Sequence, residues 1–128
     1  MKKETLTVET DEDGTVRYYN ADGNFHNPHG PAVVWDNGDK AYYINGKPHN
    51  PDGPAVVWTK GGKSYYINGK LHNENGPAVV HPDGIKWYYI NGKELTETGF
   101  KAWQAEQSAP LHNKTATIDG IEYTLTAK

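Results

Sequence analysis

The chain has 128 residues, with 13 Lys and Arg against 16 Asp and Glu, which gives a formal net charge of −3 at pH 7. This balance excludes a strongly basic nucleic-acid binder, because affinity for phosphate requires concentrated Lys and Arg. There is no cysteine, so disulfides and thiolate chemistry are excluded as well. The sequence shows neither an apolar signal core nor an 18-residue apolar stretch, which predicts a soluble, cytoplasmic protein that does not act at a membrane.

Residues 1–17 predict an N-terminal hairpin. Leu6 and Val8 alternate with polar residues, and after a DEDG turn the chain returns with Val16 and Tyr18 on the same face. Repeat proteins need atypical ends that cover an apolar edge. We therefore expect this hairpin to cap one end of a sheet.

The central part of the chain is an internal repeat. Tyrosine pairs begin at Tyr18, Tyr42, Tyr65 and Tyr88, in steps of 24, 23 and 23 residues. A period of this length is typical of short units that stack because none can bury its apolar face alone. The units span residues 18–41, 42–64 and 65–87, with a partial unit at 88–95.

Each unit contains two strand patterns and several turns. In the second unit, residues 55–58 (AVVW) and 63–67 (KSYYI) are rich in β-branched and aromatic residues. An Asn-Gly pair follows the tyrosines of each of the last three units, and this dipeptide is the strongest short signal for a hairpin. The sequence therefore predicts a mainly all-β protein, a tandem β-hairpin repeat that forms an elongated, twisted antiparallel sheet.

Alternation along the strands assigns the two faces. Tyr65 and Ile67 share one side, which we expect to be packed, as do their counterparts in the neighbouring units. The other side carries a row of aromatic residues that is the candidate partner-binding surface. Its members are Tyr43, Tyr66, Tyr89, Trp35, Trp58 and His81.

Residues 96–109 predict a short helix. Thr96 is placed to cap its N-terminus, Phe100 and Trp103 lie on one face, and Pro110 ends it. We expect this helix to cover the end of the sheet with its two aromatic residues.

Residues 110–128 predict a C-terminal hairpin. Its turn is the Asp119-Gly120 pair, and alternation places Ala116 and Ile118 on the same side as the apolar residues of the returning strand. This hairpin and the helix lie outside the repeat.

The repeated unit reads YYINGKxHNxxGPAVVxxxG, most clearly over residues 65–84. In this motif the chain resembles the MORN repeat, and most closely the MORN-variant repeats found in phage, giant-virus and bacterial proteins, over residues 18–95. The resemblance implies an elongated sheet with a groove that binds proteins, and lipid binding has been proposed for some members. It implies no catalytic residues.

Histidine recurs at one repeat position, as His26, His49 and His72. Two strands per unit separate equivalent positions by roughly 10 Å, whereas ligands of one zinc ion must lie within about 4 Å of each other. We therefore predict no metal site and no cofactor, and expect each imidazole to bond its own HNxxGP loop. A site that joins His29 or His112 to a neighbouring residue is the alternative.

No pattern typical of an enzyme is found. The acidic residues fall mainly in turns, where they bond the local backbone, and no motif places a base beside Ser64 or Ser108. The sequence predicts a non-catalytic protein.

Several binding functions are compatible with an aromatic row. The first is a protein-binding surface, since Tyr and Trp commonly carry interface energy. Carbohydrate binding is another, because rings about 10 Å apart could stack on sugars, but the row lacks a repeated exposed acid or amide cluster beyond Asn. A phage-encoded inhibitor of a host defence protein, or a sponge for a small ligand, is a third. A structural homodimer is the fourth, because large apolar patches seldom stay exposed on monomers.

Overall fold

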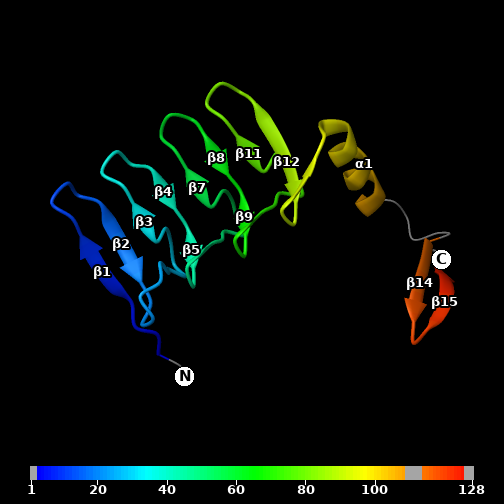
Figure 1. Cartoon of the computed structure of the whole chain (residues 1–128), viewed down its shortest axis with the longest axis horizontal. Coiled ribbons are helices and arrows are strands. Elements are labelled where there is room, and N and C mark those ends of the chain that lie inside the picture. Colours follow the sequence, from blue (N-terminus) through cyan, green and yellow to red (C-terminus); the bar gives the residue numbers. More distant parts are fainter. Residues whose placement is uncertain (1–2, 109–113, 126–128) are drawn as a thin grey trace.

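The computed structural model describes residues 3–108 and 114–125 and shows a mainly β protein. Its largest part is a nine-stranded antiparallel sheet whose strands follow one another in chain order along the molecule (Figure 1). This confirms the predicted tandem hairpin architecture. The strands are β1 (Thr7–Thr10), β2 (Val16–Tyr19), β3 (Val33–Val34), β4 (Lys40–Ala41), β7 (Val56–Val57), β8 (Lys63–Ser64), β11 (Val79–Val80), β12 (Lys86–Ile90) and β13 (Lys93–Leu95).

Each of the two central units also folds a second, smaller hairpin around its Asn-Gly turn. The strands are β5 (Tyr43–Ile44) with β6 (Lys47–Pro48), and β9 (Tyr66–Ile67) with β10 (Lys70–Leu71). Asn45 and Gly46 have φ angles of 51° and 81°, as expected for a turn with two left-handed residues. A central unit thus has four short strands instead of the predicted two.

The N-terminal hairpin forms one edge of the large sheet, as predicted. Val8 lies opposite Tyr18, and Thr10 lies opposite Val16, so the four residues share a face. Val8 is nevertheless exposed, because no second layer formed by the described residues covers this edge strand.

Most of the buried residues are small and lie in or beside the strands of the large sheet. Ala32, Ala55 and Ala78, which follow the proline of each unit, have no exposed surface, and Ala41 and Ser64 are also buried. A single-layer sheet has no room for a deep core, so its interior is limited to positions that neighbouring larger side chains can cover.

The register shows which face is more buried, and it corrects the prediction from alternation. Val56 and Val79 both lie opposite Ser64, and Val33 lies opposite Ala41, so these residues share one face. Ser64 precedes Tyr65 and therefore points to the side of Tyr66. The side of Tyr65 and Ile67, expected to be packed, instead lines an open groove.

Helix α1 (Glu97–Ser108) follows the sheet, and Thr96 caps it as predicted. The amide of Gly99 donates to Thr96 Oγ1 over 3.0 Å. Phe100 is only 3% exposed, and its ring centroid lies 4.8 Å from that of Tyr88 and 6.1 Å from that of Trp103. The helix thus covers the end of the sheet; Pro110, expected to end it, lies outside the described residues.

The C-terminal hairpin consists of β14 (Lys114–Ile118) and β15 (Ile121–Leu125). Asp119 and Gly120 form its turn with φ angles of 53° and 77°, and Ile118 lies opposite Ile121, as predicted. It pairs only with itself in the described part of the chain, as a separate two-stranded sheet.

Candidate binding surfaces

Each HNxxGP segment forms a loop, and we call these the HN loops (residues 26–31, 49–54 and 72–77). In the second, Asn50 Nδ2 donates to the Pro54 carbonyl over 3.0 Å, while Asn50 Oδ1 accepts the amide of Asp52 over 3.1 Å. Asn27 and Asn73 make the same two kinds of bond in the other loops. The asparagine therefore closes each loop.

The histidines link neighbouring units instead of closing their own loops. His49 Nδ1 accepts the backbone amide of Asn68 over 2.9 Å, and the same bond joins His26 to Asn45 and His72 to Asn91. The predicted bond to the imidazole's own loop is wrong for Nδ1, because the asparagine already closes the loop; only His72 also bonds its own loop in the described part of the chain, through Nε2 to Glu74. The structural role itself holds, since each ring fixes the Asn-Gly turn of the following unit.

These bonds set the tautomer of each neutral ring. Because Nδ1 accepts an N–H, the ring proton must lie on Nε2. His72 Nε2 lies 3.1 Å from Glu74 Oε2, and His26 Nε2 contacts the Glu4 carboxylate. Within residues 3–108 and 114–125, no three His, Asp or Glu side chains are grouped closely enough to hold a metal ion.

We define the aromatic face as the face that bears Tyr43, Tyr66 and Tyr89. Across the small hairpins, Tyr43 lies opposite Pro48 and Tyr66 opposite Leu71. The result is a tyrosine row, half-buried along its length, that alternates tyrosines with other apolar residues. Its members are Tyr19, Phe25, Tyr43, Pro48, Tyr66, Leu71 and Tyr89.

Packing within the tyrosine row is close. The ring of Phe25 lies 5.3 Å from Tyr19 and 5.3 Å from Tyr43, centroid to centroid. Burial raises the pKa of the Tyr66 phenol, and the neighbouring phenols of Tyr43 and Tyr89 raise it further. The tyrosines of successive units thus lie close enough to interact electrostatically.

A second row on the aromatic face, which we call the tryptophan row (Trp35, Trp58 and His81), is more exposed. Trp35 and Trp58 are 37% and 41% exposed. Trp58 lies over Gly62, where an added Cβ would come within 3.2 Å of the indole. His81, at the same repeat position, is half-buried, and its ring stands edge-on to the exposed Trp87 at 4.4 Å.

The six predicted surface residues therefore lie on one face, but in two separate rows. The tyrosine row and the tryptophan row run along the sheet on either side of the small buried side chains, such as Ala41 and Ser64. Phe25 and Trp87 belong to this face and were not predicted. Alternation with Tyr89 could have placed Trp87, whereas Phe25 lies outside the repeat's strand patterns and had no comparable signal.

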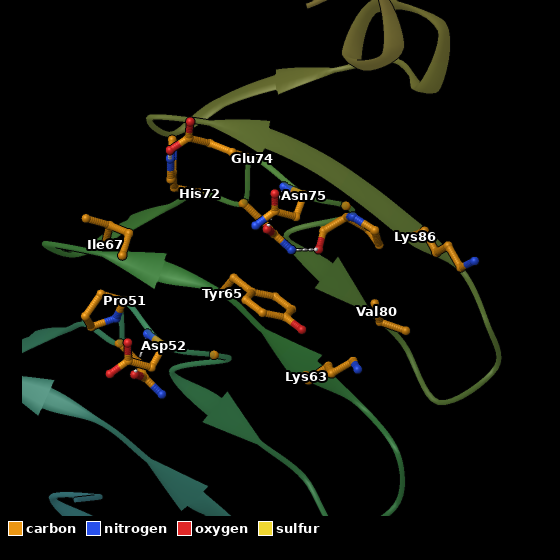
Figure 2. A pocket seen from close by; sticks show the side chains of 15 residues that line it. Pro51, Asp52, Lys63, Tyr65, Ile67, His72, Glu74, Asn75, Val80 and Lys86 are labelled. Atoms are coloured by element: carbon orange, nitrogen blue, oxygen red, sulfur yellow. Dashed lines mark hydrogen bonds and ion pairs between the residues drawn. The ribbon is translucent and has the colours of Figure 1, made fainter. Parts of the chain in front are cut away.

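The opposite face, which we call the groove face, carries two open grooves between successive HN loops. The larger, about 830 Å³, has Tyr65, Ile67 and Val80 along its floor. In Figure 2, Tyr65 lies at its centre, between the loop that carries Asp52 and the loop that carries Asn75. The other groove, about 680 Å³, repeats this floor one unit earlier, with Tyr42, Ile44 and Val57.

No protein-family model, curated protein or solved structure matches this chain. In the described part of the chain, no helix has the length and apolar character needed to cross a membrane.

Proposed function

We propose that this protein is a non-catalytic binding module whose aromatic face contacts a partner protein. The observation that supports this most directly is the exposure of Trp35 and Trp58, two large rings at one repeat position on a face that no other helix or strand of the described residues covers. Tryptophan is among the residues that dominate binding energy at protein interfaces. The half-buried tyrosine row beside it adds a preformed, rigid surface.

The arrangement favours a protein over a sugar as the partner. A sugar-binding platform needs hydrogen-bonding groups beside its rings, in addition to the rings themselves. The side chains between the two rows, such as Ala41, Val56 and Ser64, are small and mostly apolar. These side chains offer apolar area, which suits the side chains of a protein.

The experiment first captures the partner and then measures its affinity. A photo-crosslinking amino acid at Trp58 should link the aromatic face to its partner, whereas the same group at exposed Val8 on the edge strand should not. With the purified partner, Trp58→Ser should weaken binding by about 2 kcal/mol or more in calorimetry. Substitution of Lys60, an exposed residue near Trp58, by Ser is the matched control and should change affinity little.

Two outcomes would contradict the proposal. Crosslinks from Trp58 that reach only a second copy of the chain would assign the aromatic face to self-association. An unchanged affinity of Trp58→Ser for the captured partner would remove the face from the interface.

A further inference from the structure

The two grooves of the groove face have a third counterpart that the protein fills itself. Tyr42 and Tyr65 form the floors of the open grooves, and Tyr88 holds the same position in the next unit. The Phe100 ring of α1 lies 4.8 Å from Tyr88 and is almost wholly buried. Gln104 Nε2 also donates to the Glu74 carbonyl of the third HN loop over 3.0 Å.

This intramolecular contact shows which side chain the position accepts. The tyrosine floor and the adjacent HN loop together receive an aromatic ring, which is buried there without a charged partner. The two open grooves repeat the floor residues, so we expect them to accept rings as well. Tyr65 is half-buried, and its groove is open to solvent.

The charged side chains of the groove face indicate which ligand groups would lie beside such a ring. Lys63 lies opposite both Val57 and Val80, and Val80 lies opposite Lys86, so all four residues share this face. In Figure 2, Lys63 and Lys86 stand with Val80 at one end of the larger groove. Lys40, Lys63 and Lys86 are exposed, and none forms an ion pair with another described residue. At this end of the groove a row of unpaired cations favours carboxylates in a ligand, whereas Asp52 and Glu74 line the groove beside the HN loops.

The repeat length fixes the spacing of the rings. Equivalent positions lie two strands apart, or roughly 10 Å. A polyproline II segment has three residues per turn and rises about 3.1 Å per residue, so side chains three residues apart point the same way about 9.3 Å apart. Rings at positions i and i+3 of such a segment match two adjacent grooves.

We propose that the two open grooves bind an extended acidic segment of a partner protein that carries aromatic side chains three residues apart. The rings lie against Tyr42 and Tyr65, as Phe100 lies against Tyr88. Carboxylates beside the rings pair with Lys63 and Lys86. This site is on the face opposite the tryptophan row, so either proposal can fail while the other stands.

The test uses a defined probe, the peptide Glu-Glu-Trp-Pro-Glu-Trp-Glu-Glu-amide with fluorescein on its N-terminal amine, and fluorescence anisotropy with the full chain. We expect saturable binding that weakens as salt is added. The double variant Lys63→Glu with Lys86→Glu should bind about tenfold more weakly or worse, because two attractive pairs become repulsive. Lys3→Glu with Lys60→Glu makes the same change of net charge away from the grooves and should bind as the wild type does.

Two altered peptides test the ring and the charge separately. Replacing both tryptophans of the probe by alanine should abolish measurable binding, and replacing its glutamates by lysine should do the same. Trp58→Ser should leave binding unchanged, which separates this site from the aromatic face.

Three results would overturn the proposal. The probe could bind equally well to the two charge-reversed variants, it could lose affinity in Trp58→Ser, or it could fail to bind the wild type at concentrations where the protein is monomeric. A dimer found by sedimentation that dissociates in Lys63→Glu with Lys86→Glu would assign the grooves to a second copy of the chain and would equally contradict a peptide ligand.

Discussion

The joints between repeat units and the joint between the last unit and helix α1 are built differently. Units are joined by hydrogen bonds such as the one from the Asn68 amide to His49 Nδ1, 2.9 Å long. Helix α1 is joined by an aromatic contact, with Phe100 packed on Tyr88. The first kind of joint leaves the tyrosine floor of the groove face open, and the second fills it. The same repeated surface is therefore open in some units and covered in the last one, and the segment that follows each unit in the chain decides which.

The difference has a simple origin in the sequence. Residues 96–99 (TETG) stand where residues 73–76 (NENG) form the third HN loop. Phe100 replaces the counterpart of Pro77, and its amide donates to the Thr96 carbonyl over 2.8 Å, which is the first bond of the helix. Proline has no N–H and cannot make this bond. Without the proline, the fourth loop becomes a helix.

Removal of the Phe100 ring should have the largest effect on stability, because it removes the aromatic contact that joins helix α1 to the sheet. Phe100→Ala should destabilise the docked helix by about 3–5 kcal/mol, the usual cost of truncating a buried phenylalanine. We expect Trp103 fluorescence to shift to the red as α1 leaves the sheet, while hydrogen exchange in β1 to β8 stays slow.

The control for this prediction is Lys101→Ala, which removes only an exposed ion pair with Glu97 and should leave Trp103 emission unchanged. Loss of hydrogen-exchange protection throughout the sheet in Phe100→Ala would show instead that the aromatic joint supports the whole array, and that the two kinds of joint do not act separately.

Substitution of a histidine should weaken a joint between units by a smaller amount. In His49→Ala, the Asn68 amide loses its acceptor, which should lower the free energy of unfolding in urea by about 1 kcal/mol. His29→Ala is the matched control, because His29 is exposed and, among the described residues, bonds only through its backbone amide, which donates to Asn27 Oδ1. Equal stability of the two variants would mean that solvent replaces the imidazole at no cost.

Much of the fold followed from the sequence, because its signals are local. The Asn-Gly pairs, the period of the tyrosines and the Thr96 cap each dictate backbone geometry within a few residues. The partners of His26, His49 and His72 could not be predicted in this way, since each bond crosses to the next unit, 19 residues along the chain.

The assignment of faces failed for a related reason. Alternation correctly placed Tyr65 and Tyr66 on opposite faces of the sheet, but it carries no information on which face is covered. Small residues such as Ala41 and Ser64 bury readily beneath larger neighbours, and the sequence pattern gave them less weight than the tyrosines. The grooves arise where HN loops from two successive units flank one floor, and this depends on the stacking of units.

The smallest expected effect concerns the tyrosine row, which lies on the face opposite Tyr88 and Phe100. The pKa of Tyr66 is raised by burial and by its two tyrosine neighbours, so the folded state favours the neutral phenol. The stabilisation is therefore complete below the ordinary tyrosine pKa of about 10 and is lost as the pH rises through the higher pKa of the folded state. Unfolding in urea at pH 8 and pH 11 should show a smaller alkaline loss of stability in Tyr66→Phe than in the wild type.

Tyr123→Phe, which removes an exposed phenol from the separate C-terminal hairpin, is the control and should lose as much stability as the wild type. Identical losses in all three proteins would mean that Tyr66 ionises as freely in the folded array as in the unfolded chain, and that successive units do not bring their tyrosines close enough to interact.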